Sequence, residues 1–173
     1  MPIHIIIDGY NLIRQSNSFS DLDSQDIQLG REALLETLAA YRKIKHHKLT
    51  VVFDGTNAPP FSQNEIRIKG IKVKFSRKGE LADSVIKRMV NREREKALVV
   101  SSDLDIVNFA TAKGSATIGS LDFEEKIAMA MYMDTKGLET TDNGGWVPTT
   151  KKKGPSKRLP KRKRRNRIRI RKL

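Results

Sequence analysis

The arrangement of apolar residues along the chain constrains its fold most strongly. Compact, β-branched runs that suit buried strands occupy residues 4–7, 49–53, 98–100 and 115–118. Residues 71–75 alternate apolar side chains with lysine, which is typical of a half-exposed or edge strand. Apolar residues at helical spacing occupy residues 30–47, 80–96, 103–113 and 121–133. This alternation of strands and helices predicts an α/β fold with a mostly parallel central sheet covered on both faces.

Basic residues are concentrated at one end of the chain. The 173 residues include 34 Lys and Arg against 20 Asp and Glu, and 14 of the basic residues lie in residues 151–173 without a single acid. Residues 1–150 therefore carry no net charge. We expect a globular domain over residues 1–147 and a basic tail over residues 148–173. Self-repulsion predicts that the tail is disordered when free, and a polyanion is the expected partner.

Several classes of protein are excluded by what the sequence lacks. It has no cysteine, which excludes disulfides, cysteine-ligated metals and thiol nucleophiles. It has neither a glycine-rich phosphate loop nor a dinucleotide-binding glycine motif after a strand. No apolar run is long enough for a membrane span or a signal peptide. The absence of cysteine fits a reducing compartment, so a cytoplasmic location is expected.

Aspartates follow three of the expected strands. Asp8 follows the first strand, Asp54 the second, and Asp103 the strand at residues 98–100. Parallel strands would aim these carboxylates at one edge of the sheet, where α/β proteins bind ligands. Asp83, among apolar neighbours early in a helix, is a fourth candidate. Clustered carboxylates repel one another, and Mg²⁺ or Mn²⁺ would neutralise them. Such a site suits hydrolysis of a phosphodiester.

Each acid also has a purely structural interpretation. An aspartate after a strand is commonly a helix cap or a turn former, which would explain Asp103 and Asp54 separately. Asp105 is the weakest candidate, because the helix dipole favours an acid in a first turn. Coincidence at three strand ends and one helix favours a shared site.

Four segments resemble the motifs of a known family. They are Ile-Asp-Gly-Tyr-Asn-Leu-Ile at residues 7–13, Val-Val-Phe-Asp-Gly at 51–55, Ala-Asp-Ser-Val-Ile at 82–86 and Val-Val-Ser-Ser-Asp at 99–103. Together they resemble the YacP-like branch of the NYN domain family, over residues 3–133. The basic tail lies beyond this resemblance.

The resemblance implies a PIN-like three-layer fold and a metal-dependent endoribonuclease related to ribosome-associated RNA cleavage. Carried over to this chain, Asp8, Asp83 and Asp103 would be the metal ligands for Mg²⁺ or Mn²⁺. Asp54 would help to hold metal or water, and Asn11 would orient the site by hydrogen bonding. A noncatalytic RNA- or ribosome-binding factor that keeps these acids for structure is the alternative.

Two basic stretches are candidates for RNA binding. The first precedes the Asp83 helix and consists of Arg67, Lys69, Lys72, Lys74, Arg77 and Lys78. The second lies in the tail and consists of Lys161, Arg162, Lys163, Arg164 and Arg165, with ribosomal or other RNA as the expected partner. Residues 167–171 alternate at period two, a pattern compatible with a strand added to a partner. Tyr10 either stacks on a base or packs against the first loop.

Overall fold

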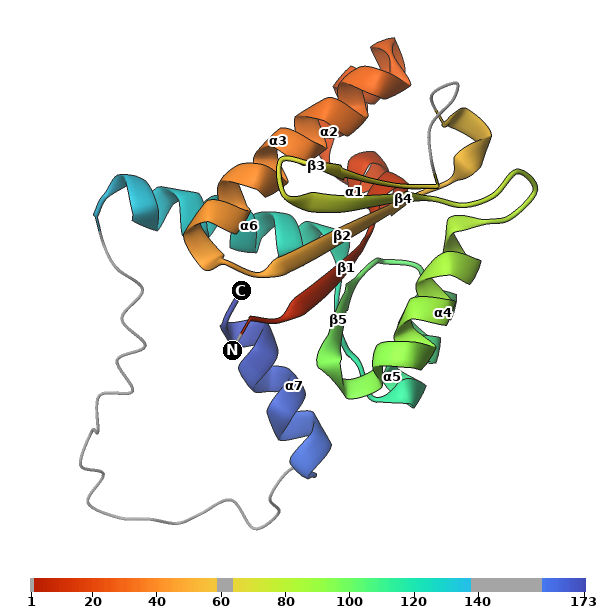
Figure 1. Ribbon diagram of the computed structural model, residues 1–173. Helices are drawn as coiled ribbons and strands as arrows, with labels where there is room; N and C mark the ends of the chain where they lie inside the picture. The colour runs from red at the N-terminus through yellow and green to blue at the C-terminus, as the bar shows by residue number, and fades with distance from the viewer. Residues whose placement is uncertain (1, 59–63, 138–159) are drawn as a thin grey trace.

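The computed structural model describes residues 2–58, 64–137 and 160–173, and a six-stranded sheet forms its centre (Figure 1). The strand order is β3-β4-β2-β1-β5-β6. Five strands are parallel: β1 (His4–Asp8), β2 (Lys48–Phe53), β4 (Ile71–Phe75), β5 (Ala97–Val100) and β6 (Ala116–Ile118). The edge strand β3 (Glu65–Ile68) runs antiparallel to β4. The predicted mostly parallel α/β fold is confirmed.

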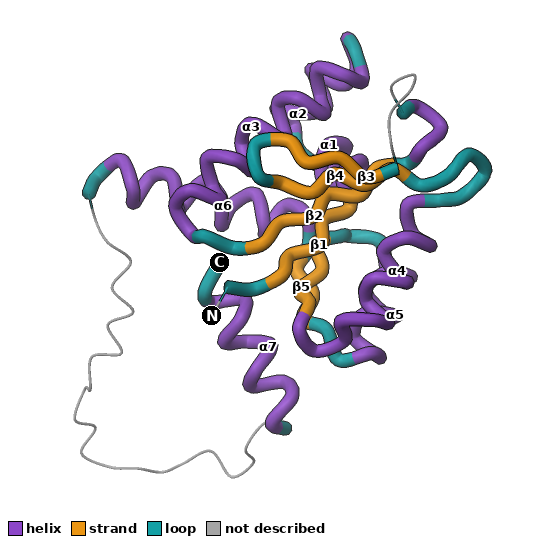
Figure 2. Tube along the Cα trace, viewed as in Figure 1, coloured by secondary structure: helices purple, strands orange, loops and turns teal. Residues whose placement is uncertain are grey.

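Helices cover both faces of the sheet (Figures 1 and 2). One face carries α1 (Gly9–Gln15), α3 (Ile27–Lys45) and α6 (Ser120–Thr135), and α2 (Asn17–Gln25) packs against α3. The other face carries α4 (Ala82–Glu93) and α5 (Leu104–Lys113). The side chains of β1 serve both cores, because Ile5 and Ile7 join the first cluster and Ile6 the second. This explains why the strand reads as a continuous apolar run.

The path of the chain places the reversal of strand order beside β1. From β1 the chain proceeds to β2 and β4, and then returns through α4 to β5 on the other side of β1. Ile7 therefore lies between Val51 of β2 and Val100 of β5. In open α/β sheets, ligands bind at the carboxyl ends of the strands where the order reverses. Here that point lies between Asp8 and the segment after Val100.

Side-chain caps create three helices between β1 and β2 where one was expected. Asp8 caps α1 through the Asn11 amide, Ser16 caps α2 through the Phe19 amide, and Asp26 caps α3 through the Gln28 amide. The first two helices are only 7 and 9 residues long. Their apolar residues repeat too few times to show a helical period.

The strand β4 is half-exposed as expected, but it is not an edge strand. It pairs with β2 on one side and with β3 on the other. Strand β3 was not expected, because its four residues alternate over too short a stretch. Glu65 on β3 pairs with both Lys72 and Lys74 on β4, and these contacts lower the Glu65 pKa to about 2.

The basic segment contains a helix, so the prediction of disorder is wrong for residues 160–173. Helix α7 (Lys161–Arg171) packs beside β6, and the pattern of residues 167–171 does not produce a strand. Leu173 is buried in the main core and Ile170 packs against it. The Tyr41 hydroxyl donates to the Leu173 carbonyl at 3.2 Å. These contacts offset the self-repulsion that a sequence of this charge suggests.

Residues 138–159 lie outside the described residues, and they include Trp146 and the first part of the basic tail. The division of the chain at residues 147 and 148 therefore stays a prediction. Among the helices described, none has the length and apolar character needed to cross a membrane.

Candidate active site

Asp8 lies at the carboxyl end of the central strand and is almost completely buried. Its Oδ1 accepts a hydrogen bond from the Asn11 amide at 3.4 Å, and its Oδ2 accepts one from Ser101 Oγ at 3.2 Å. Burial raises the Asp8 pKa to about 6. These two hydrogen bonds oppose the rise, whereas the charges of Asp83 and Asp103 add to it. The charged form of Asp8 is thus destabilised in the folded protein, and a bound cation would stabilise it.

Ser101 links two of the proposed ligands and was not identified from the sequence. It is fully buried, and its hydroxyl donates to Asp8 while accepting a bond from the Asp103 amide at 3.1 Å. The available signal was its place in the Val-Val-Ser-Ser-Asp motif. A polar side chain immediately after a buried strand and before a carboxylate is well placed to orient that carboxylate.

Asn11 connects three segments at this edge of the sheet. Its Oδ1 accepts hydrogen bonds from the Ser102 amide at 2.9 Å and from Ser120 Oγ at 2.7 Å. Ser102 Oγ in turn accepts a bond from the Ser120 amide at 3.0 Å. Asn11 therefore holds the first turn of α1 against the segment after β5 and the start of α6. Its placement suits the orienting role that the family motif implies.

Asp103 caps α5, as the structural interpretation predicted, with one carboxylate oxygen. Oδ1 accepts bonds from the amides of Asp105 at 2.8 Å and Ile106 at 3.4 Å. Both bonds use the same oxygen, so capping does not require Oδ2. Asp105 itself forms an ion pair with Lys87 on α4. Its carboxylate is therefore already paired with a lysine.

Asp83 lies in the first turn of α4 and is half-buried. Burial raises its pKa, and the charges of Asp103 and Asp105 raise it further, whereas Lys87 lowers it. Asp83 and Asp103 each also raise the pKa of Asp8. The structure thus brings Asp8, Asp83 and Asp103 within electrostatic range of one another. Of the strand-end acids, Asp8 and Asp103 take part in these interactions, together with the helix residue Asp83.

Asp54 follows β2 at the same edge but acts as a turn former. Its Oδ1 accepts hydrogen bonds from the Thr56 amide at 3.1 Å and from Thr56 Oγ1 at 2.8 Å. These bonds close a short 3₁₀ helix at Gly55–Asn57. A Cβ atom at Gly55 would lie 1.8 Å from the Ser76 carbonyl oxygen, so only glycine fits this turn.

Tyr10 packs inside the protein and offers no surface for a base. Its ring lies 5.0 Å from the ring of Phe53 and its hydroxyl accepts a bond from Arg31 Nη1 at 3.3 Å. Only 6% of Tyr10 is exposed. Packing, the second of the two interpretations, is therefore correct for this residue.

The chemistry of the donors suits a hard divalent cation, because carboxylate oxygens are the ligands that Mg²⁺ and Mn²⁺ prefer. Burial and neighbouring acids raise the pKa values of Asp8 and Asp83. A bound cation would stabilise the same two carboxylates in their charged form. In the part of the chain that the structure describes, no three His, Cys, Asp or Glu side chains lie close enough to hold an ion as they stand.

The first basic stretch is divided by its ion pairs. Lys69 pairs with Glu36 at 3.0 Å, while Lys72 and Lys74 share Glu65. Arg77 and Lys78 are exposed and line a surface hollow of about 800 Å³ at the start of α4, close to Asp83 along the chain. Unlike the lysines of β4, these two side chains form no ion pair within the described residues.

Comparison with known proteins identifies the family. The model of the YacP-like NYN domain matches residues 5–171. The chain belongs to the YacP-like NYN domain family. The match extends beyond the four motifs and includes α7, so the basic helix lies within the family pattern rather than outside it. Membership is consistent with a ribonuclease-type domain.

Two kinds of relative support this assignment. The Bacillus subtilis (strain 168) protein YacP, described as uncharacterized, is 25% identical over 85 residues, which are 49% of each chain. The matched region thus spans about half the length of this curated relative. A crystal structure of Rae1 (YacP) from Bacillus subtilis has a TM-score of 0.66 at 20% identity and covers 80% of both chains. A mutant form has a TM-score of 0.65 at 19% identity, covering 79% of this chain and 80% of the other. At this identity the structures show a shared fold.

Proposed function

We propose that this protein is a metal-dependent endoribonuclease whose active site is formed by Asp8, Asp83 and Asp103. The observation that carries the proposal is the Asp8 carboxylate, which lies buried at the carboxyl end of β1 with a pKa raised to about 6 by burial and by the charges of Asp83 and Asp103. A structural cap alone does not need three carboxylates in mutual repulsion. Family membership supports a nuclease.

The residues of the site divide the work between binding and positioning. Asp8, Asp83 and Asp103 would hold Mg²⁺ or Mn²⁺. The bound cation would lower the pKa of an attacking water and stabilise charge on the phosphodiester. Ser101 keeps Asp8 Oδ2 and the Asp103 backbone in register, and Asn11 fixes the surrounding segments. Arg77 and Lys78 would contact phosphates of the RNA beside Asp83.

RNA is also the partner proposed for the basic helix, with ribosomal RNA as one form of it. The described residues Lys161 to Arg165 are exposed, as phosphate contacts require. A location in the cytoplasm, as expected for a protein that meets translating ribosomes, belongs to the same proposal.

A cleavage assay with a short, end-labelled single-stranded RNA tests the proposal. We expect internal cuts in Mg²⁺ or Mn²⁺ and none in excess chelator. Asp8→Asn should bind the same RNA but not cut it, which excludes a contaminating nuclease. Cleavage that resists the chelator, or that persists in Asp8→Asn, would overturn the assignment.

A noncatalytic RNA- or ribosome-binding factor is the second candidate. It is favoured by the capping roles of Asp54 and Asp103 and by the lack of a ready-made metal cluster in the described residues. In that case the full chain would bind RNA with the same affinity in Mg²⁺ and in chelator, and it would never cut.

A further inference from the structure

A surface groove lies between α7 and the amino end of the sheet, opposite the acidic edge. Its volume is about 690 Å³, and Ile3 and Ile168 are among the residues that line it. Among the described residues, five basic side chains line it: Lys48 and Lys96 from the domain, and Arg165, Arg169 and Lys172 from α7. The groove therefore joins segments of the chain that are far apart in sequence.

The acids near the groove leave most of this charge uncompensated. Glu93, which lines the groove, contacts Nδ1 of His4, and Glu95 pairs with Arg165 at 3.2 Å. Among the residues the structure describes, no ion pair is formed by the side chains of Lys48, Lys96, Arg169 or Lys172. Four positive charges thus face a groove whose lining acid is already engaged.

One side chain that lines the groove has a buried atom without a partner. Nη1 of Arg169 is buried, yet within the described part of the chain it has no hydrogen bond. A buried donor without an acceptor costs free energy, most of all when it is charged. An anion bound beside this guanidinium would offset its charge, and a guanidinium binds phosphate through its fixed fork of donors.

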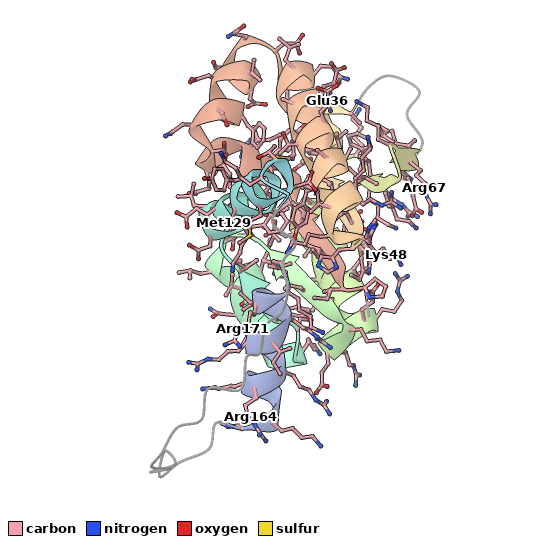
Figure 3. The ribbon with its side chains drawn as sticks, turned by 90° about the vertical axis from the view of Figure 1, so that its left-hand side faces the viewer. Glu36, Lys48, Arg67, Met129, Arg164 and Arg171 are labelled. Carbon is pink, nitrogen blue, oxygen red and sulfur yellow. The ribbon has the colours of Figure 1, made fainter. Side chains whose placement is uncertain are left out.

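Helix α7 holds its charges in place through contacts with the domain. Asn166 Nδ2 donates to the Ser115 carbonyl at 3.4 Å, and His47 Nε2 lies 3.3 Å from the Lys172 carbonyl. In Figure 3 the basic side chains of α7 extend from the helix, with Arg164 toward the end farther from the sheet. Because the helix is docked before any ligand arrives, binding there does not pay for ordering a tail.

We propose that this groove binds the phosphates of an RNA strand and anchors it apart from the site of cleavage. An RNA strand fits better than a free phosphate, because the groove is open and the exposed Lys161 and Arg164 continue its positive surface along α7. His4 at the groove and Asp8 at the acidic edge begin and end β1, so the two sites are roughly 13 Å apart along the strand. The inference rests on the proposed RNA partner but not on catalysis.

Paired charge substitutions test the groove. R169Q/K172Q removes two groove charges, and the matched control R167Q/R171Q removes two exposed charges from α7 outside the groove. Binding of a labelled single-stranded RNA to the full chain is measured by fluorescence anisotropy at several salt concentrations. We expect R169Q/K172Q to weaken binding by about tenfold and to lower the salt slope by about 1.4, at about 0.7 per phosphate contact. In the control, the logarithm of the affinity for RNA should fall by at most about a third as much.

A second variant examines the domain wall of the groove and protects the test against misfolding. K48Q/K96Q leaves α7 intact and should weaken RNA binding about as much as R169Q/K172Q. Thermal melts establish whether each variant is folded. If R169Q/K172Q is unfolded, K48Q/K96Q alone tests whether the groove binds RNA. Cleavage of a short RNA at saturating concentration should be unchanged in both.

Three results would contradict the proposal that the groove binds RNA. Equal losses in R169Q/K172Q and R167Q/R171Q would show that α7 acts only through its total charge. Full affinity in K48Q/K96Q would show that the domain wall is not involved. Displacement of the RNA by inorganic phosphate or AMP, at concentrations too low to act through ionic strength, would show that the groove binds a small anion instead. If the wild-type chain binds no RNA at all, the proposed function fails instead.

Discussion

The two ends of the central sheet differ in charge and in how that charge is assembled. At the carboxyl end, the strands or the residues directly after them supply Asp8 and Asp103, so the acidic site depends on strand order. At the amino end, the basic groove depends on α7, which lies far along the chain from β1 and β2. Local pattern therefore predicts the first site, and only long-range packing creates the second.

Removing the acids should produce the largest effect. Asp8→Asn, Asp83→Asn and Asp103→Asn should each lower the single-turnover cleavage rate more than the 10–100-fold typical of outer-shell partners. Asp105→Asn is the matched control, because Asp105 pairs with Lys87. The fold-decrease in its cleavage rate should be less than about a tenth of the decrease in the other three variants. A larger loss at Asp105 than at Asp103 would mean that the wrong acid after β5 has been assigned.

Loosening α7 should cost stability at the opposite end. Leu173→Ala removes a buried side chain from the main core and should lower the free energy of unfolding by about 2–3 kcal/mol. Ile168→Ala is the control on the same helix, since Ile168 is 53% exposed and should change stability little. Urea unfolding measures both. Equal stability of the two variants would show that α7 is not docked as described.

Ser101 should control the protonation of Asp8. Its hydroxyl stabilises the charged carboxylate, so Ser101→Ala should raise the Asp8 pKa above its value of about 6. Carbon-13 NMR titration of the aspartate carboxyl groups, without added metal, measures the shift. Cleavage should fall as well, by roughly 10–100-fold, as for other groups that orient a ligand. An unchanged Asp8 titration with reduced cleavage would assign Ser101 to the backbone of Asp103 instead.

The smallest effect expected is a change in the pH dependence of stability. Because the folded-state pKa of Asp8 is raised from 3.8 to about 6, the folded protein binds this proton more tightly than the unfolded chain does. The contribution of Asp8 therefore makes stability fall as the pH rises from about 4 through 6. Asp8→Asn removes this contribution and should be more stable than wild type at pH 7 to 8, by about 1–2 kcal/mol.

Thermal melts of both proteins between pH 4 and 8 measure this difference. Mg²⁺ should narrow the gap at pH 7 by stabilising wild type alone, since only wild type carries the charge that the cation neutralises. An Asp8→Asn variant that is less stable than wild type at pH 8 would contradict the claim that ionised Asp8 destabilises the folded protein.

The sequence alone determined much of the fold and the positions of its acids. Buried strands show in short β-branched runs, and the alternation of strands with helices predicts a parallel sheet. Once the strands are parallel, Asp8, Asp54 and Asp103 must share one edge. The long helices α3, α4, α5 and α6 were predictable for the same reason, because their apolar residues repeat several times.

Tertiary structure decided what each charged or polar group does. Glu65 and Glu36 neutralise three lysines of the basic stretch, and the cross-links made by Asn11 and Ser101 join segments about 90 residues apart. The docking of α7 depends on Tyr41 and His47, which the sequence of the tail cannot reveal. Local periodicity reports the shape of a segment, whereas pairing and burial depend on contacts that only the folded chain brings together.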